Sequence, residues 1–173
     1  METQIEESLN VKWDISQYRL RPEQEKFLKR TSKMLKEHPD VSINVQPFQY
    51  SSKEKEHILF FETKKKYFLL VHDKKTTDFS EADSIHVSKM SIKDDDLVRY
   101  ISKNLSDTVM FTIQEKCINF VGHGPVNAGF RKLAKAREMS FLSVFAKDGT
   151  GRQVNMFAGK DGIPYTGFSQ FIL

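Results

Sequence analysis

Residues 121–171 constrain the fold of this chain more than any other part of its sequence. After a Gly-rich loop, side chains suited to one buried helical face recur every three or four positions: Phe130, Leu133, Ala134, Arg137, Phe141, Val144 and Phe145. We expect Asn127 to cap this helix, because its side-chain oxygen can accept a hydrogen bond from a free N–H of the first turn. Gly149 should end the helix, and Val154 and Met156 then alternate with polar residues as in a strand.

A second helix followed by a strand is predicted near the start of the chain. The helix should begin at Pro22, since proline is well suited to the first helical turn. It should end before Pro39, which disfavours helical backbone in the residue that precedes it. Val41, Ile43 and Val45 then alternate as a strand.

Residues 56–73 fit either of two structures. Ser51 followed by Glu54 is a capping-box pattern, which favours one helix through this segment. Two strands joined at residues 63–66 fit the apolar pattern as well. The consecutive lysines Lys64–Lys66 would lie on an exposed helix face in the first case and at a hairpin tip in the second.

Further elements are predicted in the middle of the chain. A polar loop over residues 76–83 should lead into a short strand over residues 85–90. Asp94 can then cap a helix, because an acidic side chain suits the positive end of the helix dipole. Asp107 can cap another helix, although the spacing over residues 108–113 also fits a strand.

This alternation of helices and strands predicts an α/β (α+β) fold in which helices pack on a small mixed sheet. Residues 1–20 are interpreted as a polar lead-in in which Trp13 can dock. Residues 21–173 are expected to form one domain, or two halves over residues 21–74 and 84–173.

The composition is that of an ordinary globular domain, and no catalytic set is recognisable. A net charge of +4 and a pI near 9 suit weak attraction to anionic partners, and also suit a surface of solvated lysines. The single cysteine, Cys117, excludes an intrachain disulfide. The three acidic residues 94–96 are interpreted as a helix start rather than as a metal site. We therefore expect a protein that is not an enzyme and that uses no cofactor and no metal.

Part of the C-terminal stretch resembles the OmpA-like domain. Matches to the family's turn, helix and helix end are Gly122, His123, Leu133, Ala134, Arg137 and Gly149. In that family an Asp after the turn and the helix Arg clamp the diaminopimelate of peptidoglycan, and here Pro125 stands at or beside the position of the Asp. The resemblance implies OmpA-like helix-strand units, and it makes Arg137, His123 and Asn127 the candidate ligand-binding residues.

A wider likeness covers roughly residues 20–171. The segments LKRTSKMLKEHPDVSINVQPF, SIHVSKMSIKDDDLVRYI and RQVNMFAGKDGIPYTGFSQF are similar to the C-terminal region of AsmA-like envelope proteins of Bacteroides-type bacteria. Such proteins are anchored in the inner membrane and extend into the periplasm. The resemblance implies a non-enzymatic cell-envelope domain for protein contact or outer-membrane assembly, whose partner is an envelope protein or the cell wall.

Location depends on whether this chain is part of a larger protein. As part of an anchored parent it would be periplasmic, and it would meet the membrane only through that parent. As a complete chain it would be cytoplasmic, because METQIEESLNVKWD lacks the basic start and apolar core of a signal peptide.

Two other functions stay open from the sequence. One is a peptidoglycan-binding OmpA-like module that uses Arg137 and His123. The other is a basic module that binds nucleic acid through Lys64–Lys66, Lys74 and Lys75, although nucleic acid is not the partner that we expect.

Overall fold

The computed structural model describes residues 10–105, 112–161 and 168–173. Within them the chain forms six α-helices and a small mixed sheet of five strands, which confirms the predicted α+β fold. The chain divides into two compact units. The first unit is Met1–Lys53 with Arg131–Leu173, and the second is Glu54–Phe130. This division differs from two halves over residues 21–74 and 84–173, because the end of the chain returns to the sheet begun near its start.

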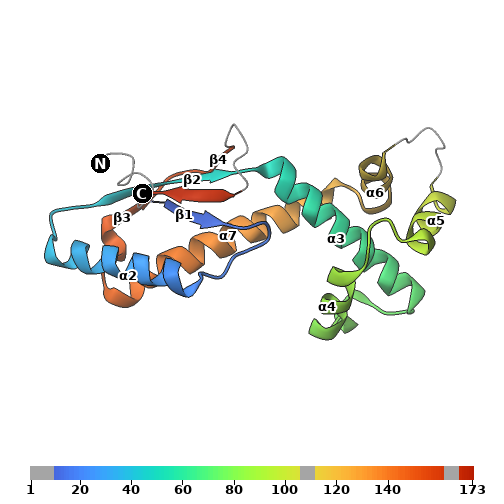
Figure 1. Ribbon diagram of the computed structural model, residues 1–173, viewed down its shortest axis with the longest axis horizontal. Helices are drawn as coiled ribbons and strands as arrows, with labels where there is room; N and C mark the ends of the chain where they lie inside the picture. The colour runs from blue at the N-terminus through green and yellow to red at the C-terminus, as the bar shows by residue number, and fades with distance from the viewer. Residues whose placement is uncertain (1–9, 106–111, 162–167) are drawn as a thin grey trace. The chain divides into compact units, whose positions relative to one another are not determined.

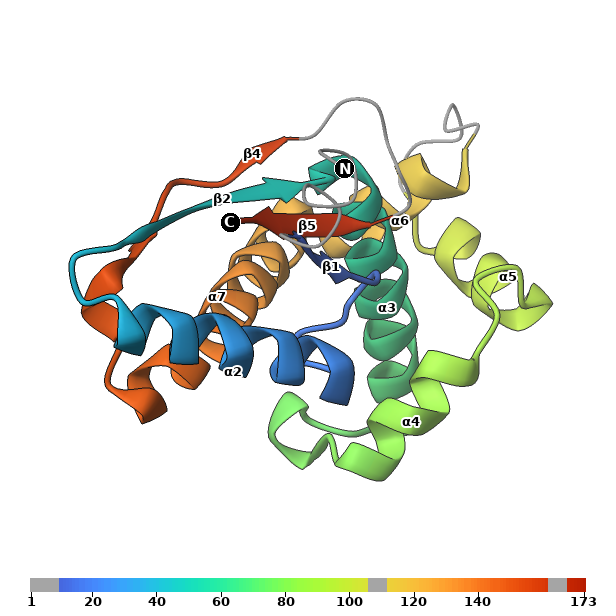
Figure 2. The same ribbon diagram turned by 60° about the vertical axis from the view of Figure 1, so that its left-hand side comes forward.

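The sheet belongs to the first unit. Its strands are β1 (Asn10–Trp13), β2 (Ile43–Gln49), β3 (Val154–Met156), β4 (Lys160–Asp161) and β5 (Ser169–Ile172). Strand β5 lies between β1 and β2 and is antiparallel to both, as Figure 2 shows. Strands β3 and β4 pair with successive parts of β2, both in parallel. The expected lead-in over residues 1–20 therefore contains an edge strand of the sheet.

Two helices cover one face of this sheet. They are α2 (Pro22–Glu37) and the part of α7 (His123–Asp148) that belongs to the first unit, and Figure 1 shows both along the same side of the strands. The core between these helices and the sheet is made of the buried residues Val11, Trp13, Leu28, Leu35, Val45, Phe141, Val144, Phe145 and Phe171. Full burial of one such side chain contributes roughly 1.5–3 kcal/mol. The opposite face of the sheet carries exposed polar side chains such as Lys12, Asn44 and Asn155.

Helix α2 has the predicted bounds, and polar side chains satisfy both of its ends. At its start, the backbone N–H of Arg21 donates to Oε1 of Gln24 over 2.7 Å. At its end, Nε2 of Gln153 shares its two hydrogens among the carbonyl oxygens of Leu35, His38 and Val41, which lie 2.9, 3.0 and 2.7 Å away. The carbonyls of Leu35 and His38 also accept the backbone N–H groups of His38 and Val41. Gln153 directly precedes strand β3, so its side chain ties the start of β3 to the turn that ends α2.

Helix α7 ends as predicted and begins five residues earlier than a cap at Asn127 predicts. Gly149 has a φ of 78°, and Thr150 donates its N–H to the carbonyl oxygen of Phe145 over 2.9 Å, which is a Schellman ending. The helix begins at His123, so Asn127 lies in its second turn and is not its cap. Gly122 alone, at a φ of 85°, separates α7 from the preceding helix.

The second unit is helical in the described residues. It contains most of α3 (Ser51–Val71), the short η1 (Thr76–Asp78), α4 (Glu81–Lys89), α5 (Asp95–Lys103), α6 (Ile113–Val121) and the start of α7. Leu59, Cys117 and Val126 form its buried cluster. Residues 56–71 belong to α3, so the hairpin alternative is wrong. No helix of the described ranges is both long and apolar enough to span a membrane.

The strand predicted over residues 85–90 is wrong, because residues 85–89 belong to helix α4 and Met90 is its C-cap. Ser80 caps α4: its Oγ accepts from the N–H of Asp83 over 3.1 Å, and a carboxylate oxygen of Asp83 accepts from the N–H of Ser80 over 2.9 Å. This capping box starts a helix within the segment predicted as a loop. Val87 is then fully buried on the inner side of α4.

Side-chain caps start the next two helices as well. A carboxylate oxygen of Asp94 accepts from the N–H groups of Asp96 and Leu97, both over 3.1 Å, which confirms the predicted cap of α5. Thr112 caps α6 together with Glu115. The predicted cap at Asp107 and the alternative strand over residues 108–113 fall mainly outside the described residues.

Candidate functional site

Arg137, the principal ligand candidate from the sequence, has its guanidinium engaged within the protein. The residue is only 3% exposed. Its Nε donates to the carbonyl oxygen of Gln17 over 2.7 Å, and its Nη2 donates to that of Asp14 over 2.8 Å. The guanidinium carbon also lies 5.8 Å from the centre of the Trp13 ring. Arg137 therefore fixes the loop after β1, and these contacts give it a structural role.

The other two ligand candidates belong to the second unit. His123 is exposed as the first residue of α7, and Asn127 is half-buried one turn later. Arg137 belongs to the first unit. The three residues that the OmpA-like resemblance singles out are thus divided between units.

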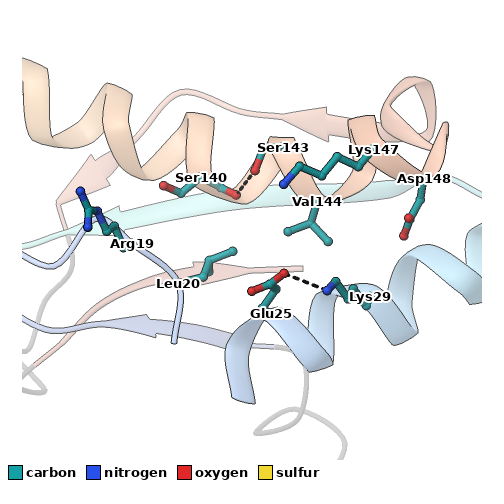
Figure 3. Close-up of a pocket in the computed structure, with 9 residues that line it drawn as sticks. All are labelled: Arg19, Leu20, Glu25, Lys29, Ser140, Ser143, Val144, Lys147 and Asp148. Carbon is teal, nitrogen blue, oxygen red and sulfur yellow. Dashed lines mark hydrogen bonds and ion pairs between the residues drawn. The ribbon is translucent and has the colours of Figure 1, made fainter. Parts of the chain in front are cut away.

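A small cleft lies between α2 and the last turns of α7 (Figure 3). Its volume is about 270 Å³, and its charged lining residues are Arg19, Glu25, Lys29, Lys147 and Asp148. Glu25 and Lys29 form an ion pair of 2.9 Å, and this bond lowers the pKa of the Glu25 carboxyl. Ser143 donates its hydroxyl to the carbonyl oxygen of Ser140 over 2.8 Å, so this proton is held by a backbone carbonyl and not by a general base.

A larger groove, named here the Phe157 groove, lies in the first unit where β2, β3 and α7 meet. Its volume is about 430 Å³. Its apolar lining residues include Pro47, Met156, Phe157 and Phe171, and its basic lining residues are Arg131 and Lys135. The backbone N–H of Phe157 donates to the carbonyl oxygen of Val45 over 2.9 Å, which fixes the residue beside β2. The residue itself is 51% exposed. The groove thus combines an apolar floor with a basic rim.

Gly159 packs closely against Gln49 in the loop beside Phe157. A Cβ placed on Gly159 would lie 2.7 Å from Nε2 of Gln49, so the flexible end of the Gln49 side chain would have to move aside. The loop also separates β3 from β4, so the outer edge of the sheet is interrupted where the groove opens. The sequence alone does not show the groove beside this loop.

A third groove, named here the lysine groove, lies in the second unit. Its volume is about 610 Å³. Its lysines are Lys65, Lys66, Lys74 and Lys75, and its apolar residues include Leu69, Leu70, Val121 and Pro125. Four of the five lysines that the sequence singled out therefore line one surface, together with an apolar floor that the sequence did not indicate.

The fifth of those lysines, Lys64, is buried instead. Its Nζ donates to the carbonyl oxygens of Ser88 and Met90, over 3.3 and 3.1 Å, at the end of α4. Burial lowers the pKa of this ammonium, while the negative end of the α4 dipole favours its charge. Lys64 is thus a structural cap of α4 and not part of an exposed basic surface.

Charge is unevenly divided between the two units. The first unit has sixteen Lys and Arg against eleven Asp and Glu, and the second has eleven against twelve. The net positive charge of the chain therefore resides in the first unit, whereas the basic lysine groove lies in a unit that is close to neutral.

The described ranges contain no group of three or more His, Cys, Asp or Glu able to hold a metal ion. Asp94 is used as a helix cap. Cys117 is buried, and desolvation raises the pKa of its thiol, which disfavours the nucleophilic thiolate.

No family model, curated protein or solved structure matches this chain.

Proposed function

We propose that this chain is a non-enzymatic domain of the bacterial cell envelope that binds another protein. The resemblance of three of its segments to the C-terminal region of AsmA-like proteins supports the envelope part of the proposal. The Phe157 groove carries the binding part, because a half-exposed aromatic beside an apolar floor is the kind of anchor point at which protein interfaces concentrate their binding energy.

The groove is suited to a partner rather than to catalysis. Its apolar lining residues Pro47, Met156 and Phe171 offer no group for acid–base or nucleophilic chemistry, and its acidic lining residue is Glu138. Arg131 and Lys135 are exposed at its rim, where charges set the orientation and the association rate of a partner more than its affinity. Glu138 lies 3.9 Å from Lys135 and partly offsets that charge.

Site-specific photo-crosslinking in cells that carry the native gene tests this function. A photoreactive phenylalanine analogue at Phe157 should give crosslinks to another protein in the envelope fraction. The matched control is Met34, which is 39% exposed on α2 and lies outside the Phe157 groove. Equal yields at the two positions, or crosslinks confined to the cytosolic fraction, would contradict the proposal.

A further inference from the structure

We infer that the lysine groove binds an acidic segment of a partner protein, with an apolar side chain of that segment seated on Leu69, Leu70, Val121 and Pro125. This inference rests on the proposed protein-binding function and places a second contact surface in the second unit. It follows from three features of the groove: its floor, its unneutralised lysines, and the charge of the unit around it.

The floor of the groove is aliphatic and accessible. Leu70 is 51% exposed, and Val71 beside it is 52% exposed, although both lie in a helix whose other residues build the core of the unit. Leu69, Val121 and Pro125 bring apolar surface from α3 and from the junction of α6 with α7. Such a surface gains from being covered, because burial removes its apolar area from water.

Three of the four lysines keep charges that no carboxylate neutralises in the described parts of the chain. Lys74 forms an ion pair of 2.9 Å with Asp83. Lys66 donates instead to the carbonyl oxygen of Phe120 over 2.6 Å, and Lys65 lies 4.8 Å from the centre of the Phe79 ring. Lys65, Lys66 and Lys75 have no ion pair there, and the groove includes one acidic residue, Glu62.

The positions of these lysines favour more than one carboxylate on the ligand. Lys65 and Lys66 lie on α3, whereas Lys75 follows that helix and precedes η1. A single carboxylate is too small to contact lysines on separate elements while an apolar group occupies the same groove. A peptide with acidic residues on both sides of an apolar one meets this requirement.

Nucleic acid fits the groove less well than an acidic peptide. Single strands are held by aromatic platforms on which bases stack, and the floor is made of Leu, Val and Pro. Phosphate-driven binding also needs a broadly positive surface, and the second unit has eleven basic against twelve acidic residues. Local positive charge in a unit that is nearly neutral suits a short acidic segment.

Fluorescence anisotropy with the 173-residue chain and labelled synthetic peptides tests the inference. The probe is Glu-Glu-Leu-Leu-Glu-Glu, and the comparison peptides are Gln-Gln-Leu-Leu-Gln-Gln and Glu-Glu-Ser-Ser-Glu-Glu. The probe should bind at least about tenfold more tightly than either, because each comparison peptide lacks one of the two required features. A labelled ten-nucleotide oligothymidylate tests the competing ligand.

Matched variants locate the binding. Leu70→Asp and Lys75→Glu should each weaken the probe about tenfold or more. The controls are Ile85→Asp, at a residue also 51% exposed, and Lys103→Glu, both in the second unit and outside the groove; neither should change the affinity. Three results would overturn the inference. They are equal effects of groove and control variants, equal binding of the three peptides, and oligothymidylate binding that is tighter than peptide binding and is lost in Lys75→Glu. If the probe peptide does not bind but position 157 still gives crosslinks, only the inference about the lysine groove is overturned. If the peptide binds but position 157 gives no crosslinks, the proposed interface at Phe157 is overturned.

Discussion

The hydroxyl oxygens of Ser32 and Thr150 lie 2.6 Å apart, although 118 residues separate them in the sequence. Ser32 is fully buried on α2, and Thr150 is 3% exposed directly after α7. The Thr150 hydroxyl also lies 3.3 Å from the carbonyl oxygen of Phe145, to which it can donate while it accepts from Ser32. This pair joins the two helices that cover the sheet at the point where the second one ends.

Replacement of Thr150 by Val should destabilise the protein by about 1–3 kcal/mol, because it leaves the Ser32 hydroxyl buried without a partner. The double variant Ser32→Ala with Thr150→Val should lose less free energy of unfolding than the two single variants lose together, since neither buried hydroxyl then remains. Urea unfolding of the wild type, both single variants and the double variant measures this difference. A double variant that loses the sum of the single losses would show that the two hydroxyls do not interact.

Replacement of Gln153 should weaken the end of α2. Gln153→Ala removes the donor to three carbonyl oxygens and should lower the free energy of unfolding by about 1–2 kcal/mol. Gln153→Glu should lower it more at neutral pH, because a carboxylate cannot donate and is repelled by the negative end of the helix dipole. Urea midpoints at pH 7 compare the two variants. The reverse order would mean that the side chain acts through its volume rather than as a donor.

Arg137→Ala should reduce stability whether or not the protein meets peptidoglycan. Each hydrogen bond from the buried guanidinium to a carbonyl oxygen contributes roughly 1.5–3 kcal/mol. Thermal unfolding and sedimentation with purified cell wall measure the two properties separately. Specific retention on the cell wall that Arg137→Ala abolishes, in a variant that stays folded, would restore Arg137 as a ligand residue.

Local signals in the sequence predicted much of the fold and little of the surface. Pro22, Asp94 and Gly149 act on neighbouring residues, so the start of α2, the cap of α5 and the end of α7 could be predicted. Helix α4 was missed, although Ser80 and Asp83 contain its capping signal. The partners of Arg137 are 120 and 123 residues away in sequence, and nothing local to Arg137 indicates them.

The two grooves show the same limit. The sequence drew attention to Lys65, Lys66, Lys74 and Lys75 because they form runs. It could not show that Val121 and Pro125 supply apolar surface beside them, since that placement depends on how α6 and α7 pack against α3. Lys64 belongs to the same run and is buried, because one residue along a helix turns a side chain by about 100°.

Asp83 should make the stability of the second unit depend on pH in the acid range. The hydrogen bond from Lys74 and those from Ser80 lower the pKa of the Asp83 carboxyl from 3.8 to about 2. Because the folded state favours the carboxylate, its contribution is present above the unfolded pKa and is lost as the pH falls from about 4 to about 2. Asp83→Asn should therefore flatten the pH dependence in that interval, whereas Glu81→Gln, at an exposed residue of the same helix, should not. Urea midpoints followed by helical circular dichroism between about pH 4.5 and 2 test this, and equal slopes for wild type and Asp83→Asn would contradict it.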